Sequence, residues 1–352
     1  MTENSDSQAN RLRPVGHAML AVIIALVLSS FLDARALHKS AVNQPAGTGR
    51  DLAMAATGAL QGVSNFTQIT QIRQGIANVV GLGDKDTINT KVIIPIKAPA
   101  PPIVPTKLAK PTKPVVPVKE VFSPQKKMKL YFGGDSLMGT VGLAMEQIGP
   151  RTGVMTVEPA DFHISTGLNR PDAFNWFSHL TEMLKVEDPD VVSLMFGGND
   201  ADAYMSGLPE NAKQSEHFGD AVWKQEYRRR VGGMMDLATQ KPGRLVIWMG
   251  EPQMEESALN EKIIKLNEVY KSEAAKRPGR VIYLDLYSLF SPNGAKYSDT
   301  ITVGGIKKVV RAPDGVHITM EGGAVVSGEV LKLLARQYDL RNFTPASLSL
   351  TG

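Results

Sequence analysis

Residues 130–137 read Leu-Tyr-Phe-Gly-Gly-Asp-Ser-Leu, and this stretch decides the fold. Three apolar residues run directly into a glycine turn with a serine, and helical sequence continues from Met138. A short apolar run is typical of a strand that is buried on both faces of a parallel sheet. A serine on a tight turn at the start of a helix exposes its hydroxyl, and nearby backbone N–H groups gain from the helix dipole. The stretch therefore predicts a buried strand whose carboxyl end presents Ser136.

Further apolar runs of the same kind follow along the chain, at residues 191–196, 245–249 and 281–284. Between them lie amphipathic stretches whose apolar residues recur at intervals of three or four, which predicts helices. One such set is Trp223, Tyr227, Val231 and Met234. Alternating strands and helices imply right-handed βαβ units and hence a three-layer α/β/α fold with a parallel sheet. The chemistry of such folds lies at the carboxyl ends of the strands.

Two other polar motifs occupy such positions. The run at 191–196 leads into Gly-Gly-Asn199-Asp200, and a later loop reads Asp314-Gly-Val-His317 just before helical sequence. An aspartate three residues before a histidine can orient the imidazole, while the histidine reaches a serine elsewhere. Each motif alone is common in turns and helix caps. Together, in this order, they indicate nucleophilic catalysis by Ser136 with His317 and Asp314.

These motifs resemble a known family. GDSL at 134–137, GGND at 197–200 and DGVH at 314–317 are similar to the first, third and fifth blocks of the SGNH (GDSL) hydrolase superfamily. The second block needs a glycine after the second strand, and the stretch 164–168 supplies Gly167. The resemblance covers about residues 128–338.

The resemblance implies a role for each site residue. Ser136 would be the nucleophile, His317 the general base and Asp314 the residue that orients it. The Ser136 N–H, the Gly167 N–H and the Asn199 side-chain amide would form the oxyanion hole. The resemblance also implies a flavodoxin-like sheet and no cofactor.

The remaining titratable residues suggest no metal site. The chain has no Cys, which excludes disulfides, zinc–thiolate sites and a thiol nucleophile. No paired-histidine or clustered-carboxylate spacing is present, so we expect no metal and no cofactor. His163 and His179 are expected to be structural, and Asp135 is expected to fix the turn beside the nucleophile.

The charge is unevenly distributed. Residues 1–129 hold 16 basic and 7 acidic side chains, whereas residues 130–352 hold 23 basic and 28 acidic ones. A nucleic-acid-binding domain carries its positive charge on the folded module that touches phosphate. We therefore expect no nucleic-acid partner.

The N-terminal third predicts a membrane attachment. No residue between Arg13 and Asp33 is charged, and this length is close to the ~20 residues that span a bilayer as a helix. Arg11 and Arg13 precede the segment, as expected when the N-terminus stays in the cytoplasm. A signal anchor is the favoured interpretation. A signal peptide cleaved after the small-x-small site at residues 34–36 is the alternative.

The predicted organisation follows the chain in order. Residues 95–117 hold eight prolines with interleaved lysines, a composition typical of a polyproline II spacer. Residues 40–90 contain weak helical spacing, first at Leu52, Ala56 and Leu60 and then near 69–80. The segments are a cytoplasmic N-terminus (1–13), a transmembrane anchor (14–33), a juxtamembrane region (34–94), a Pro/Lys-rich linker (95–127), the hydrolase domain (128–340) and a C-terminal tail (341–352).

One further element is predicted close to the site. Residues 300–303 and 306–310 flank Gly304-Gly305, a pattern typical of a β-hairpin. The hairpin ends shortly before Asp314 and should stand on the rim of the site. It could shape a sugar- or acyl-binding surface together with Trp176, or it could be an edge decoration without a role.

These features favour an envelope-anchored serine esterase that removes O-acyl groups, in particular O-acetyl groups, from a periplasmic or cell-surface glycan. The catalytic domain would lie in the periplasm, attached to the inner membrane by a single pass. The same triad could instead transfer an acyl group to a glycan hydroxyl, so an O-acyltransferase is the second hypothesis. A lipase- or thioesterase-like hydrolase and a non-catalytic glycan-binding scaffold are further alternatives. The oligomeric state stays open.

Overall fold

The computed structural model describes residues 37, 52–58, 60, 91, 92, 94, 119–294, 296–341 and 343. The predicted membrane segment, the cleavage site at 34–36, the helical stretch near 69–80 and the proline-rich segment lie outside these residues. Among the helices that are described, none combines the length and the apolar character needed to cross a membrane. The chain divides into two compact units, residues 1–87 and 88–352. In the first unit, residues 52–58 are helical, as the spacing of Leu52 and Ala56 predicts.

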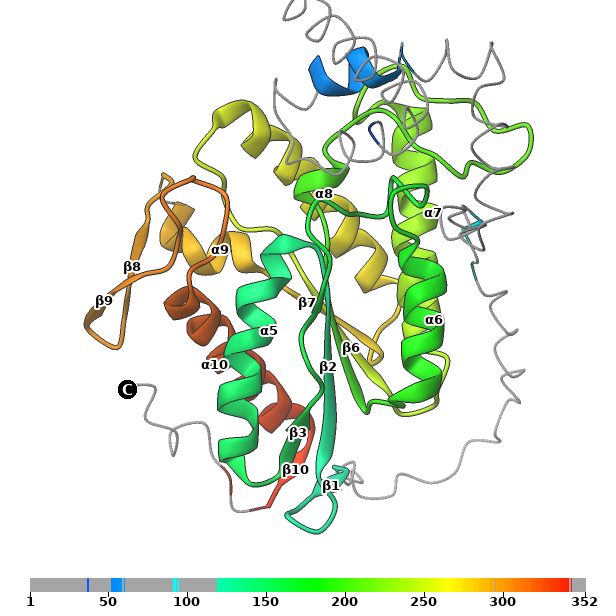
Figure 1. Ribbon diagram of the computed structural model, residues 1–352. Helices are drawn as coiled ribbons and strands as arrows, with labels where there is room; N and C mark the ends of the chain where they lie inside the picture. Colours follow the sequence, from blue (N-terminus) through cyan, green and yellow to red (C-terminus); the bar gives the residue numbers. More distant parts are fainter. Residues whose placement is uncertain are drawn as a thin grey trace, which may run out of the picture. The chain divides into compact units, whose positions relative to one another are not determined.

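The second unit is built on a parallel sheet (Figure 1). Its strands lie in the order β3-β2-β5-β6-β7, and β4 pairs with the end of β2. The strands are β2 (Met128–Gly134), β3 (Met155–Val157), β4 (Asp161–Phe162), β5 (Val191–Met195), β6 (Leu245–Met249) and β7 (Val281–Leu284). In chain order this is the flavodoxin-like arrangement, with the switch point between β2 and β5. The predicted parallel α/β sheet is confirmed.

Helices cover both faces of the sheet. In Figure 1, α5 and α10 lie together on one side, whereas α6 and α7 lie on the other, where α7 also packs against α8. The helices are α5 (Ser136–Ile148), α6 (Trp176–Val186), α7 (Ala221–Ala238), α8 (Ser257–Ala275), the short α9 (Leu286–Phe290) and α10 (Met320–Gln337). Within residues 119–294 and 296–341, three 3₁₀ turns complete the connections: η1 (Gly149–Thr152), η2 (Gly198–Asp200) and η3 (Pro292–Gly294).

The core lies on both sides of the central strands. Every residue of β5 and β6 is buried, because each of these strands has helices on both faces. The large side chains Trp176, Trp223 and Trp248 are also buried. Burying one large apolar side chain contributes about 1.5–3 kcal/mol. This packing holds the carboxyl ends of β2 and β5 side by side.

The folded unit begins earlier than the boundary predicted at residue 128. Within the predicted linker, β1 (Val121–Phe122) forms a parallel pair with β10 (Asp339–Leu340). Phe122 is buried, and its ring contacts Tyr338 edge-on. Val92 and Ile94, from the predicted juxtamembrane region, pack against the same core. The linker prediction extended too far because it rested on proline content, whereas these short segments are placed by apolar contacts with distant residues.

The predicted hairpin is present. Strands β8 (Thr300–Val303) and β9 (Ile306–Val309) pair antiparallel around Gly304 and Gly305. Both glycines have positive φ values, 58° and 81°, as a tight two-residue turn requires. The chain then continues into the loop that carries Asp314.

Candidate active site

Ser136 is the first residue of α5, directly after the β2 turn. Asp135 caps this helix, because its side chain accepts a hydrogen bond from the Leu137 N–H at 2.9 Å. The other carboxyl oxygen of Asp135 accepts the Gly197 N–H at 3.1 Å, which ties the first motif to the third. Gly134 is required here, since a Cβ at this position would overlap the Met195 carbonyl of the neighbouring strand. Asp135 fixes the turn, as the sequence predicts.

Ser136, His317 and Asp314 form one hydrogen-bonded chain. The Nε2 atom of His317 lies 2.9 Å from the Ser136 Oγ, and its Nδ1 atom lies 2.6 Å from the Asp314 Oδ2. The second carboxyl oxygen of Asp314 accepts the backbone N–H groups of Val316 and His317, both at 2.9 Å. Three hydrogen bonds thus fix the carboxylate, which in turn fixes the plane of the imidazole. This is the arrangement that activates a serine nucleophile.

The pKa of Asp314 is lowered to about 2. Partial burial acts to raise it, but hydrogen bonds from the His317 backbone and ring and from the Val316 N–H outweigh that effect. Asp314 is therefore ionised at neutral pH. An ionised partner favours the imidazole tautomer with its proton on Nδ1, which leaves Nε2 free to accept the Ser136 proton.

Arg311 holds the loop that carries the histidine. It is buried, and its guanidinium donates to the Val316 carbonyl at 2.6 Å and also to the Gln253 carbonyl. The Ala312 N–H donates to the His317 carbonyl at 2.8 Å, which closes the loop. The sequence motifs gave Arg311 no role. Its role depends on carbonyl groups that the fold brings together, so no sequence signal reveals it.

Asp200 joins the third motif to the second. It is fully buried, and its carboxylate accepts the N–H groups of Leu168 at 2.9 Å and Asn169 at 2.8 Å, and the Tyr227 hydroxyl at 2.9 Å. A Cβ on Gly167 would overlap this carboxylate, so only glycine fits. Sequence reasoning assigned no role to Asp200, although its position directly after Asn199 was a usable signal.

The proposed oxyanion donors follow neighbouring strands. Ser136 begins α5 after β2, Asn199 lies in η2 after β5, and Gly167 lies in the loop after β4. Gly167 is buried and Asn199 is half-buried. Within the described part of the chain, the Ser136 N–H, the Gly167 N–H and the Asn199 amide group donate to no acceptor. Their role in holding an oxyanion stays a prediction.

Glu251 is a buried carboxyl group near the site, and the sequence motifs gave it no role. It lies two residues beyond β6 and is fully buried against Gly197. Neither of its carboxyl oxygens has a hydrogen-bond partner among the described residues. Burial, and next the charge of Asp135, raise the pKa of Glu251, whereas Arg311 acts to lower it. Burial likewise raises the pKa of Asp135, to about 7. Burial therefore shifts the titration of both carboxyl groups to higher pH than usual.

A second cluster contains both histidines that were expected to be structural. His163 and His179 direct their Nε2 atoms at the carboxylate of Asp161, at 3.2 and 2.6 Å. Asp161 lies in β4, His163 directly follows this strand, and His179 lies in α6. No sequence signal pointed to this cluster, because the fold joins residues whose sequence spacing has no recognisable pattern.

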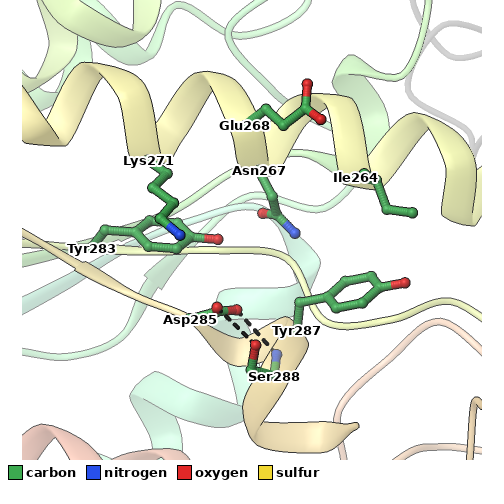
Figure 2. A pocket seen from close by; sticks show the side chains of 8 residues that line it. All are labelled: Ile264, Asn267, Glu268, Lys271, Tyr283, Asp285, Tyr287 and Ser288. Atoms are coloured by element: carbon green, nitrogen blue, oxygen red, sulfur yellow. Dashed lines mark hydrogen bonds between the residues drawn. The ribbon is translucent and has the colours of Figure 1, made fainter. Parts of the chain in front are cut away.

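A hollow of about 300 Å³ lies between α8, the end of β7 and α9 (Figure 2). Its lining includes the rings of Tyr283 and Tyr287, and Asp285 caps α9 by accepting from Ser288. None of the predicted site residues lines this hollow. It is separate from the triad.

Several solved structures are similar to this chain. An acetylxylan esterase from Geobacillus stearothermophilus is 17% identical, with 61% of this chain and 97% of that chain covered and a TM-score of 0.40. A member of the lipolytic G-D-S-L family from Veillonella parvula is 18% identical, with 59% and 99% covered and a TM-score of 0.39. A gut microbial diltiazem-metabolizing enzyme is 14% identical, with 70% of this chain covered and a TM-score of 0.39, and this chain spans about half (49%) of its length.

A family assignment comes from the sequence. None of the curated proteins matches the chain. The strand order and the Ser136–His317–Asp314 contacts agree with the expectations that the sequence motifs raised. The model of the family described as "Protein of unknown function (DUF459)" matches residues 129–333, well over half of the chain. The chain therefore belongs to the DUF459 family.

Proposed function

We propose that this protein is a serine hydrolase that cleaves O-acyl esters. The observation that carries the proposal is the continuous hydrogen-bonded chain from Ser136 through His317 to Asp314. A serine hydroxyl is a weak nucleophile, and a neutral imidazole at hydrogen-bond distance is the partner that activates it. A purely structural role would not require the imidazole to be fixed by a carboxylate that three donors hold in place.

In the proposed mechanism, the Ser136 Oγ attacks the acyl carbon while its proton passes to the His317 Nε2. The tetrahedral oxyanion would accept hydrogen bonds from the Ser136 N–H, the Gly167 N–H and the Asn199 amide. Collapse breaks the ester C–O bond, and His317 returns the proton to the leaving alcohol. A water molecule then attacks the acyl-enzyme with His317 as base, which releases the carboxylic acid and restores Ser136.

We propose a short acyl group, in particular acetyl, on a glycan as the substrate. The side chains of His317 and Asp314 are 37% and 50% exposed, so the triad lies at the surface. An open site suits a small ester carried on a bulky polymer better than a long acyl chain, which needs a deep apolar pocket. The same openness admits water, which favours hydrolysis over transfer to another hydroxyl.

The test is a hydrolysis assay on the full-length chain in detergent. Acetyl, butyryl and octanoyl p-nitrophenyl esters are compared, each with and without an O-acetylated or deacetylated glycan, and Ser136→Ala serves as the blank. We expect turnover with water that falls as the acyl chain lengthens. Release that requires the deacetylated glycan as acceptor would instead indicate an O-acyltransferase, and a preference for octanoyl would indicate a lipase-like enzyme. Equal rates for the wild type and Ser136→Ala would overturn the proposal.

We propose further that residues 14–33 anchor the protein in the inner membrane, with the hydrolase unit in the periplasm. The support is the uncharged segment between Arg13 and Asp33. Protease added to spheroplasts should digest the hydrolase unit, with a cytoplasmic protein as the intact control. Protection of the unit in intact spheroplasts would contradict the proposed topology.

A further inference from the structure

The Asp161–His163–His179 cluster lies beside the turn that presents the nucleophile. The strand β4 pairs with the last residues of β2, and the His163 N–H donates to the Gly134 carbonyl at 3.0 Å. Successive side chains of β4 point to opposite faces of the sheet. Phe162 lies over Gly139 of α5, so Asp161 and His163 point to the opposite face, where α6 brings His179.

The donor atoms converge as metal ligands do. One oxygen or nitrogen from each of the three residues lies within 4.8 Å of the others. The centroids of the two imidazole rings are 5.1 Å apart, and the ring planes are 81° apart. Two imidazoles that bind one Zn²⁺ at ~2.1 Å with a tetrahedral angle have ring centroids about 5 Å apart. The rings therefore already have the separation that a shared ion requires.

The surroundings hold these side chains in place. The His163 ring stacks on Phe174 at 3.9 Å, and Trp176 contacts both imidazoles edge-on. The Tyr131 hydroxyl donates a hydrogen bond to the carboxylate of Asp161. Carboxylates that bind metals are commonly held by such a hydrogen bond. The side chains of His163 and His179 are 38% and 28% exposed, so an ion can enter from solvent.

We propose that Asp161, His163 and His179 form a site for a divalent transition metal, Zn²⁺ in particular. Two neutral imidazole nitrogens and one carboxylate oxygen are a ligand set that suits Zn²⁺, with water in the fourth position. The ion would join β4 to α6. It would also fix the loop from His163 to Gly167, whose Thr166 hydroxyl already donates to the His163 carbonyl at 2.6 Å. The site is distinct from the triad and takes no part in the ester chemistry proposed above.

The competing explanation is an ion-free cluster in which both imidazoles donate N–H hydrogen bonds to the Asp161 carboxylate. The two explanations differ in what they predict for binding. A site for an ion takes up one equivalent of metal and releases protons as it does so, whereas an ion-free cluster takes up none.

The experiment measures Zn²⁺ binding by the untagged full-length chain in detergent after treatment with a chelator. Calorimetry against Zn²⁺ gives the stoichiometry, and the visible spectrum with Co²⁺ reports the ligand geometry. The variants are His163→Gln and His179→Gln, whose side chains can still donate a hydrogen bond to Asp161. The matched control is His217→Gln, in the loop before α7, and Ser136→Ala tests independence from the triad.

We expect one equivalent of Zn²⁺ to bind the wild type, His217→Gln and Ser136→Ala alike, with a tetrahedral Co²⁺ spectrum. His163→Gln and His179→Gln should each bind at least about tenfold more weakly. Zn²⁺ should also raise the Tm of the wild type and of His217→Gln more than that of His163→Gln. Absence of stoichiometric binding, or equal binding by His163→Gln and the wild type, would overturn the site. Neither result depends on whether the chain hydrolyses esters.

Discussion

The Nε2 atom of His317 lies 2.9 Å from the Oγ atom of Ser136, although 181 positions separate the two residues. Both are held independently of each other: Ser136 by the Asp135 cap at the start of α5, and His317 by the loop around Arg311. The two supports also meet, because the Thr140 hydroxyl of α5 donates to the Ile318 carbonyl at 3.0 Å. The distance between the His317 Nε2 and the Ser136 Oγ is thus set by the packing of the first and last parts of the unit 88–352.

Ser136→Ala and His317→Ala should therefore reduce ester hydrolysis to a similar extent. Ser136 supplies the nucleophile and His317 its base, so the two act as one unit and the double variant should be no slower than either single variant. The measurement is kcat/KM for p-nitrophenyl acetate, with circular dichroism to show that each variant folds. Retention of more than a few per cent of turnover by folded Ser136→Ala would show that another group is the nucleophile.

Asp314→Asn should cost activity with little change in stability. The amide oxygen can still accept the N–H groups of Val316 and His317, but its NH₂ group would face the His317 Nδ1 and favour the wrong tautomer. We expect kcat to fall by about 10³–10⁴. The matched control is Asp285→Asn, which alters a capping aspartate at α9, away from the triad. A loss below tenfold would show that Asp314 does not orient the imidazole.

Asn199→Ala tests the proposed oxyanion hole. Because the Asn199 amide donates to no acceptor in the described part of the chain, its removal should leave the Tm unchanged. Loss of one oxyanion donor should lower kcat by about 10²–10³, with KM little affected. Asn169 makes a suitable comparison, because its side chain donates to the Asp200 carbonyl at 2.9 Å and Asn169→Ala should lower the Tm. A rise in KM alone for Asn199→Ala would assign Asn199 to substrate binding.

Structural features that depend on one short segment of the chain could be predicted from the sequence. Strands β6 and β7 have the predicted ends, because an apolar run between polar residues marks a buried strand at both ends. The contact between Asp314 and His317 could be predicted because both residues lie in one short loop, and the position of Ser136 could be predicted because its strand and turn are adjacent in sequence. Arg311, Asp200 and the Asp161 cluster could not be assigned in this way, since their partners come from other elements of the fold.

Glu251 offers a test of the buried carboxyl groups beside the site. Its pKa is raised, chiefly by burial, so the folded protein binds this proton more tightly than the unfolded chain does. The associated stability is fully present below the ordinary glutamate pKa of ~4.3 and is lost as the pH rises towards the raised value. The pKa of Asp135 is raised to about 7, so ionisation of Asp135 also reduces the stability of the folded protein as the pH rises.

Glu251→Gln should therefore flatten the pH dependence of the Tm. The amide stays neutral at every pH, so the variant should gain stability relative to the wild type between pH 5 and pH 8, while part of the slope persists because Asp135 remains. Each 1 kcal/mol of that gain corresponds to roughly 2–4 °C in Tm for a unit of this size. Thermal unfolding followed by circular dichroism at several pH values measures the effect, with Glu256→Gln as an exposed control. If the Tm curves of Glu251→Gln and the wild type stay parallel from pH 5 to pH 8, the Glu251 carboxyl group has the same pKa in the folded and unfolded chain.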